Sequence, residues 1–159
     1  MSIFDQDAQR VWKLMKKIGQ CMLVTNRAGR LRARPMHALP DEKEGLIHFL
    51  TAVEGQKDDE VARSPSVCLT FTDGERYLSV SGSAVVSQDK AKIRALWSTE
   101  AQAWWDSPDD PSIRVLTITP IAAEFWENPG KIVTAVDLAV AAVSGVRPPI
   151  GPTHKVEMR

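Results

Sequence analysis

The spacing of apolar positions changes from helical to strand-like near the start of the chain. Within residues 7–18, Val11, Leu14, Met15 and Ile18 recur at helical intervals, which predicts an amphipathic helix that ends at Gly19. After this helix come short runs rich in Val, Ile, Leu, Phe and Thr, separated by turn residues, which is typical of strands. The predicted strands are residues 21–25, 31–39, 46–51, 67–72, 77–86, 115–119 and 122–126.

Turn and cap residues mark the boundaries between these runs. The segment from Asn26 to Gly29 predicts the turn of a hairpin between the first two strands, and Asp73-Gly74 predicts another turn. Gly82, inside the strand at 77–86, indicates a bend or a close backbone approach. Asp89 is a candidate cap for a helix that reaches Trp97.

The other segments give weaker patterns. Residues 57–63 form a short, charged stretch typical of an exposed helix start, and residues 132–143 are apolar enough for a helix. The Pro- and Gly-containing tail from residue 147 is expected to be extended. We therefore expect one domain over residues 1–145 and an extended tail over residues 146–159.

Composition and charge exclude several classes of protein. Hydrophobic residues make up 43% and charged residues 25% of the 159 residues, as in an ordinary globular domain. Twenty basic residues balance twenty acidic ones, so no net field attracts nucleic acid. No apolar run approaches the roughly 20 residues that span a membrane, and the first residues do not form a secretory signal. We expect a cytoplasmic protein without nucleic-acid or membrane partners.

Cysteines and histidines give no sign of a metal site. Cys21 and Cys68 each lie inside an apolar run, where a thiol usually behaves as a small buried hydrophobe. His37, His48 and His154 are not spaced as metal ligands with Cys, Asp or Glu. No serine lies in a nucleophile-elbow sequence. The sequence therefore predicts neither a metal site nor a catalytic residue.

Short strands this closely spaced, with helices at the ends and between them, favour an antiparallel barrel over a doubly wound sheet. The sequence contains neither a Gly-x-Gly-x-x-Gly nor a Walker motif, either of which would have favoured the doubly wound sheet. A small barrel is filled by its own side chains, so a sizeable ligand must bind outside it or where two subunits meet. This geometry favours a dimer.

Several short motifs occur in an order that matches a known family. They are Arg-Ala-Arg-Pro-Met at 32–36, His-Phe-Leu-Thr at 48–51, Lys57, Ser-Pro-Ser-Val at 64–67, Arg-Tyr-Leu-Ser-Val-Ser-Gly-Ser-Ala at 76–84, Asp-Lys-Ala-Lys-Ile-Arg-Ala-Leu-Trp at 89–97, Asp-Asp-Pro at 109–111 and Ala-Glu-Phe-Trp at 123–126. In this order the chain resembles the pyridoxamine 5′-phosphate oxidase-like flavoproteins, and in particular the general stress protein 26 family. The resemblance covers about residues 7 to 130.

The resemblance implies a fold, a cofactor and a set of binding residues. The implied fold is mainly β with flanking helices, a six-stranded antiparallel split β-barrel that forms a homodimer with FMN at the subunit interface. Arg34 would be the main phosphate anchor, Pro35 and Met36 would run beside the flavin ring, and Tyr77 would reach the FMN of the partner subunit. The implied cofactor-binding residues are Arg32, Arg34, Pro35, Met36, Leu50, Thr51, Gln56, Lys57, Tyr77 and Trp126.

Two departures from the family pattern lie just before Lys57. Gly55 stands where the family often has a serine, two residues before the lysine, and Gln56 stands where a relative has arginine. The oxidases also follow their Phe-Trp pair with an Arg-x-His-x-Arg type sequence, whereas here Phe125-Trp126 is followed by Glu-Asn-Pro-Gly-Lys-Ile-Val. The sequence therefore argues against pyridoxamine phosphate oxidation.

Three functional hypotheses follow from the resemblance. The first is an FMN-dependent oxidoreductase with a small-molecule redox partner. The second is a flavin-binding stress protein that stores or senses flavin without turnover. The third is a relative that has changed its ligand to a deazaflavin or haem, because of Gly55 and Gln56.

The residues alone allow simpler interpretations of the same positions. Arg32 and Arg34 alternate with Leu31 and Ala33, as on the solvated face of a strand. Lys57 could belong to an exposed helix start, and Thr51 could cap a turn. Trp97, Trp104 and Trp105 are expected to pack in the core or at a dimer contact rather than against the flavin.

Overall fold

The computed structural model describes residues 3–52, 61–127, 142–145 and 153–158. Its elements, in chain order, are α1 (Ile3–Ile18), β1 (Gln20–Arg27), β2 (Arg30–His37), β3 (Leu39–Asp41), β4 (Leu46–Ala52), β5 (Ser66–Thr72), β6 (Arg76–Ser87), α3 (Lys90–Leu96), the 3-10 helix η1 (Ala101–Ala103), β7 (Ile113–Glu127) and β8 (Thr153–Glu157).

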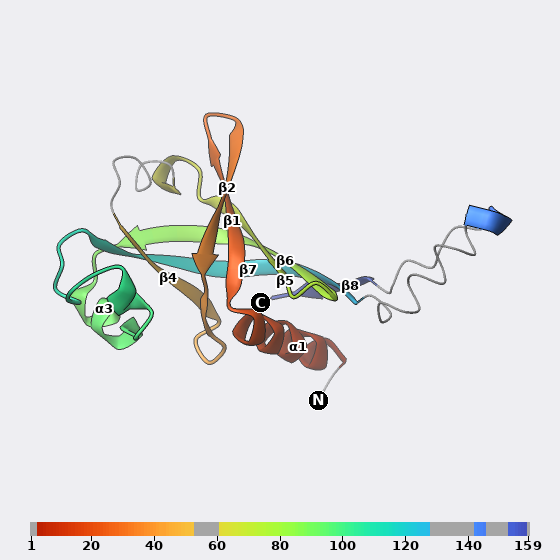
Figure 1. The fold of residues 1–159 in the computed structure, drawn as a ribbon, viewed down its shortest axis with the longest axis horizontal. Coiled ribbons are helices and arrows are strands. Elements are labelled where there is room, and N and C mark those ends of the chain that lie inside the picture. The colour runs from red at the N-terminus through yellow and green to blue at the C-terminus, as the bar shows by residue number, and fades with distance from the viewer. Residues whose placement is uncertain (1–2, 53–60, 128–141, 146–152, 159) are drawn as a thin grey trace.

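The strands form one antiparallel sheet in the order β2-β1-β5-β6-β7-β4-β3, with β8 added beside β7 (Figure 1). The long strands β6 and β7 form its spine, and the β1–β2 hairpin projects from it. The predicted mainly β antiparallel architecture with flanking helices is confirmed. The described strands number eight rather than six, and their pairings do not close the sheet.

Two strand boundaries differ from the prediction. The run at 31–39 is divided at Ala38, whose N–H bonds to the Gly19 carbonyl at 2.8 Å, so that β2 pairs with β1 and β3 pairs with β4. The runs at 115–119 and 122–126 are one continuous strand, β7. Pro120, which separates them in the sequence, lies opposite Gly82 at a bulge in the β6–β7 ladder.

The bulge requires a glycine on β6. A Cβ atom added at Gly82 would lie 2.5 Å from the Thr119 carbonyl oxygen and 2.9 Å from a methyl carbon of Ile118. Since real Cβ atoms do not approach backbone oxygen so closely, only glycine fits without moving β7. The predicted close approach at Gly82 is confirmed.

The predicted turns and caps are also confirmed. Asn26 closes the β1–β2 turn by accepting the Gly29 N–H at its side-chain oxygen, 2.9 Å away. The Asp89 carboxylate accepts the Lys92 N–H at the start of α3, 3.1 Å away. Gly19 ends α1 with a φ of 71°, which glycine adopts without strain.

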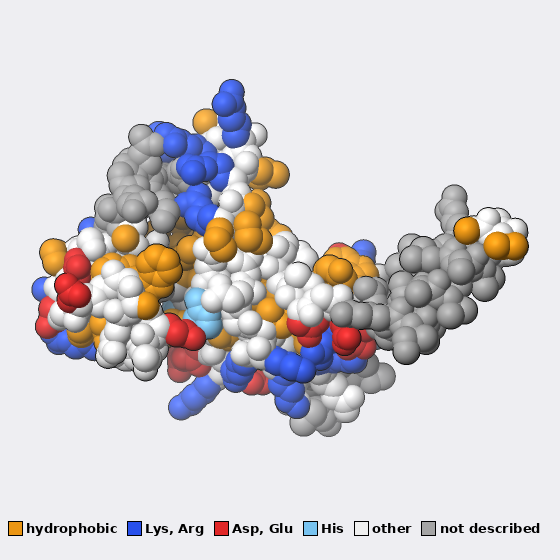
Figure 2. Space-filling view, in the orientation of Figure 1, with side chains coloured by type: hydrophobic (Ala, Val, Ile, Leu, Met, Phe, Trp, Pro, Cys, Tyr) orange, Lys and Arg blue, Asp and Glu red, His pale blue; other side chains and the backbone are white. Residues whose placement is uncertain are grey.

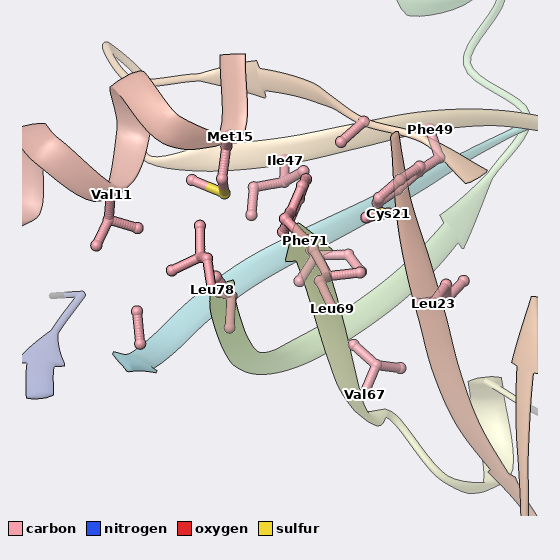
Figure 3. Close-up of a cluster of buried hydrophobic side chains, with 14 of the residues drawn as sticks. Val11, Met15, Cys21, Leu23, Ile47, Phe49, Val67, Leu69, Phe71 and Leu78 are labelled. Carbon is pink, nitrogen blue, oxygen red and sulfur yellow. The ribbon is translucent and has the colours of Figure 1, made fainter. Parts of the chain in front are cut away.

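The main core lies between α1 and the sheet. Figure 3 shows Val11 and Met15 of α1 facing Leu78, Phe71 and other apolar side chains of the strands. Burial in this cluster raises the pKa of the Cys21 thiol to about 12, so the thiol stays protonated. Both cysteines are free thiols, and Cys68 is half-buried.

A smaller core lies under α3. Ile93 of α3 packs with Ile113 and Val115 of β7, and Leu50, Leu96, Trp97 and Trp105 pack around them. The packing role predicted for Trp97 and Trp105 is therefore confirmed. Trp104 is 80% exposed and belongs to neither core, so of the two packing roles only a dimer contact stays a prediction for it.

The last described strand, β8, joins the sheet beside β7. His154 stacks on Phe125, and Val156 is buried in the main core. Most of the helix predicted at 132–143 lies outside the described residues, of which 142–144 are helical. None of the described helices has the length and apolar character needed to cross a membrane.

Candidate functional site

The β2 strand presents arginines at every second position. Arg30, Arg32 and Arg34 alternate with Leu31 and Ala33, so the three basic side chains leave the strand on one side. Figure 2 shows Lys and Arg side chains gathered over the β1–β2 hairpin, with hydrophobic side chains beneath them. This hairpin is a surface suited to an anionic group.

Arg34 is half-buried, unlike Arg30 and Arg32. It lies opposite the buried Leu23 in the β1–β2 ladder. Its Nη2 donates to Oγ1 of Thr25, 3.0 Å away, and Thr25 is only 3% exposed. A guanidinium held in this way has a fixed orientation, and its planar donor group suits a phosphate or carboxylate.

A cavity of about 390 Å³ adjoins this strand. It lies between β2, β4 and the segment that contains η1, and Pro35, Met36, Leu50 and Thr51 all line it. The structure thus brings together four of the predicted cofactor-binding residues, which come from two separate motifs. The remaining lining residues are Gln20, His37, Leu39, Ala52, Ser98, Glu100, Ala101, Trp104 and Trp105.

Leu50 and Thr51 are the two predicted residues that line the cavity from β4. Leu50 packs against the smaller core while contributing to the wall. Thr51 is 8% exposed and lies opposite Arg114 in the β4–β7 ladder. Its hydroxyl donates to the Ala52 carbonyl, 3.5 Å away.

A polar triad occupies another part of the cavity wall. His37 Nε2 lies 2.9 Å from Oε2 of Glu100, and His37 Nδ1 lies 3.2 Å from Nε2 of Gln20. The His37 ring also lies against Gly19, where an added Cβ would be 3.1 Å from His37 Cε1.

Sequence reasoning missed this triad. Gln20 and His37 meet across the β1–β2 ladder, whereas Glu100 is far away along the chain. The cross-strand pair follows from the hairpin register, but no local pattern relates either residue to Glu100.

Tyr77 and Trp126 lie far from Thr51 within one chain. They face each other across the β6–β7 ladder, near the end of β7 that pairs with β8. Thr51 lies opposite Arg114, twelve residues before Trp126 on the same strand. At ~3.3 Å per residue, this separation is roughly 40 Å of strand. The structure therefore does not bring Tyr77 and Trp126 together with Thr51 in one chain, and neither residue lines the cavity.

Gln56 and Lys57 lie outside the described residues. Arg32 lies on the exposed part of β2, opposite Thr25.

His48 is buried behind the cavity wall rather than exposed in it. Its Nδ1 lies 3.1 Å from Oγ1 of Thr117, and the side chain is 1% exposed. Burial, aided by the positive charge of Lys92 and opposed by Asp41, lowers the pKa of His48. A neutral imidazole in this position serves the packing between β4 and β7.

Comparison with known proteins identifies the family. The model of the family described as "Pyridoxamine 5'-phosphate oxidase like" matches residues 6–149, which is most of the chain. The protein belongs to this family.

Two of the similar proteins are described as general stress protein 26. General stress protein 26 of Bacillus subtilis is 30% identical over 112 residues, covering 65% of this chain and 75% of its own. A solved structure described as a general stress protein 26 from Jannaschia sp. CCS1 has a TM-score of 0.71 and 25% identity. It aligns with 96% of this chain and 99% of its own.

Another solved structure shares the fold of the oxidase-like family. It is the general stress FMN/FAD binding protein from Xanthomonas citri, with a TM-score of 0.70 and 24% identity, covering 80% of this chain and 92% of its own. At this identity the match supports the fold alone.

Proposed function

We propose that the protein binds FMN as a homodimeric split-barrel flavoprotein and acts as an FMN-dependent oxidoreductase on a small-molecule partner. The observation that carries the proposal is the position of Arg34. This arginine is held by the buried Thr25, and the next two residues of its strand, Pro35 and Met36, line a cavity together with Leu50 and Thr51.

The donor set suits a flavin phosphate. A phosphate monoester carries a charge of about −2 near neutral pH and binds best to several charge-assisted donors. Arg34 and Arg32 would supply guanidinium groups, and Thr51 and Lys57 would add a hydroxyl and an ammonium. The fixed Arg34 loses little side-chain entropy on binding, which favours affinity.

The cavity wall suits the flat, mostly apolar ring of a flavin. Met36 and Leu50 offer apolar contact, and the backbone of β2 at Pro35 and Met36 offers polar groups along a straight edge. A bound flavin would supply the redox chemistry, because its ring accepts a hydride and passes it on. The chain would then bind and orient the ring.

A second copy of the chain would complete the site. Tyr77 is 44% exposed, and it lies with Trp126 roughly 40 Å of strand from Thr51 of its own chain. In a dimer the aromatic pair of one subunit could face the flavin of the other. This arrangement follows the resemblance to the family and motivates the homodimer.

The test is a titration of the purified, full-length protein with FMN and with riboflavin, followed by flavin fluorescence. Arg34→Gln should lower the affinity for FMN by at least about tenfold, since it removes a charged phosphate contact. The affinity for riboflavin, which lacks the phosphate, should change by no more than about twofold. Arg30→Gln, at the exposed start of β2, is the matched control. Equal effects on FMN and riboflavin would contradict the role of Arg34 as the phosphate anchor.

A second measurement separates turnover from storage. Anaerobic NADPH or NADH is added to the FMN-loaded protein while the oxidised-flavin absorbance is followed. Rapid bleaching supports the oxidoreductase, whereas tight binding without bleaching by any donor favours a flavin store or sensor. If the purified protein shows an absorption spectrum typical of a deazaflavin or haem, that ligand and not FMN is the cofactor.

A further inference from the structure

The cavity has a rim that phosphate binding does not use. Gln20, His37, Glu100 and Trp104 form it, and they come from β1, β2 and the segment around η1. The rim combines one acidic side chain with one exposed aromatic side chain.

The contacts of the triad orient the acidic group of this rim. The amide nitrogen of Gln20 is a donor, and it lies 3.2 Å from His37 Nδ1. On the other side of the ring, His37 Nε2 lies 2.9 Å from Oε2 of Glu100. His37 therefore fixes the position of the Glu100 carboxylate, which is the acidic group of the rim.

Trp104 lines the same cavity as Glu100. Its backbone N–H bonds to the Ala101 carbonyl at 3.0 Å, and the following Trp105 packs against the smaller core. The packing of Trp105 fixes the backbone next to Trp104, while Trp104 itself remains 80% exposed. The face of a tryptophan attracts cations, and here the indole is open to a ligand in the cavity that Trp104 lines.

We propose that this rim binds the redox partner, and that it selects a planar nitrogen heteroaromatic carrying positive charge or N–H groups over an anion of the same shape. The carboxylate of Glu100 and the amide oxygen of Gln20 are acceptors for such groups, and Trp104 offers its face to the ring. The role as redox partner rests on the proposed function, whereas the charge preference depends on the rim alone.

The test compares three probes that share one ring and differ in charge. These are 1-methylnicotinamide, which is a cation, neutral nicotinamide, and anionic nicotinate. Their binding to the full-length protein is measured by ligand-observed NMR at low ionic strength, where charge effects are least screened. The cation should bind about tenfold more tightly than the anion, with the neutral probe between them.

Variants assign this preference to the rim. Glu100→Gln should bring the three affinities within about twofold of one another, while Trp104→Ala should weaken all three. Glu44→Gln, on the exposed β3–β4 turn, is the matched control and should preserve the preference. No saturable binding, equal affinities in the unaltered protein, or a preference that survives Glu100→Gln would overturn the proposal.

A repeat with saturating FMN separates the rim from the flavin site. Undiminished binding of the cation to the FMN-loaded protein supports a separate partner site. Competitive displacement by FMN would overturn it, since the rim would then belong to the flavin ring. Charge-selective binding by a protein that binds no FMN would instead overturn the proposed function and, with it, the redox role of the rim.

Discussion

Phe125 and His154 stack ring on ring, with centroids 4.4 Å apart and planes 6° from parallel. Arg10 of α1 lies over the same Phe125 ring, 5.1 Å from its centroid, and forms an ion pair with Glu127. The C-terminal strand is therefore joined to both the sheet and the first helix.

This relationship predicts that the end of the chain contributes to stability. Val156 is 5% exposed in the main core, so Val156→Ala should lower the free energy of unfolding by about 2 kcal/mol in urea titrations. Glu157→Ala, on the exposed neighbour, should change it by less than about 0.5 kcal/mol. Equal effects would mean that β8 contributes no buried contact.

The same contact bears on a deletion of residues 146–159. If the tail only covered a neighbouring flavin site, its removal would change flavin accessibility and leave the melting temperature unchanged. Because β8 pairs with β7, we expect the melting temperature to fall even without flavin. Thermal unfolding of the flavin-free protein makes this comparison.

Gly82 gives a second prediction. Gly82→Ala should destabilise the protein by about 2 to 4 kcal/mol, because the new methyl would meet the Thr119 carbonyl oxygen at 2.5 Å and force β6 and β7 apart. Ser81→Ala, at the exposed position next to it, is the control and should cost less than about 0.5 kcal/mol. Urea unfolding of both variants measures the difference, and a neutral Gly82→Ala would refute the close approach.

His48 predicts how stability changes with pH. Burial lowers its pKa from the ordinary value of 6.5, so below about pH 6.5 the unfolded chain takes up a proton that the folded protein does not. This difference destabilises the fold as pH falls, by up to about 1.4 kcal/mol per pH unit, until the folded pKa is reached. Above pH 6.5 the effect is absent.

The measurement is urea unfolding between pH 5 and 8 for the unaltered protein and for His48→Gln. The variant should be less stable at pH 8 because it disturbs a buried contact, yet its stability should fall less steeply below pH 6.5. Parallel curves for the two proteins would show that His48 does not titrate differently on folding.

The β5–β6 turn predicts an acid-dependent contribution. Asp73 accepts the backbone N–H groups of Glu75 and Arg76 and pairs with the Arg76 guanidinium at 2.6 Å. The hydrogen bonds from Arg76 are the main cause that lowers the pKa of Asp73 from 3.8 to about 2. The stabilisation is thus complete above about pH 3.8 and is lost as pH falls towards 2.

Asp73→Asn tests this window. The turn is partly exposed, where solvent screens the ion pair, so the variant should lose only about 1 kcal/mol at pH 7. Near pH 2 the two proteins should differ little in urea or thermal unfolding. A difference that is the same at both values would assign the effect to turn geometry rather than to charge.

Much of the fold could be predicted because its signals are local. The first helix shows its apolar face at a spacing of one turn, and Gly19, Asn26 and Asp89 mark ends and turns through their own backbone or side-chain chemistry. The break at Ala38 and the continuity of β7 could not be predicted in this way. Both depend on pairing with residues distant in sequence, namely Gly19 and Gly82.

In the candidate site, too, the residues in local motifs were predictable and the contacts between distant segments were not. Pro35, Met36, Leu50 and Thr51 were predictable because each lies in a short motif that resembles the family, and the cavity confirms only that they meet. The contact between His37 and Glu100 was not predictable, since it depends on how the segment around η1 lies against β2. Cofactor binding by any of these residues remains a prediction.

The outer position of β2 has a consequence for solubility. As the first strand in the sheet order, it has a neighbour among the described strands on one side only. An open edge of this kind invites other chains to add strands and aggregate. Three arginines and a proline among its eight residues oppose such addition, because like charges repel an incoming copy and proline cannot donate a ladder hydrogen bond. Replacing these arginines and the proline by neutral residues would therefore make aggregation through the edge of β2 more favourable.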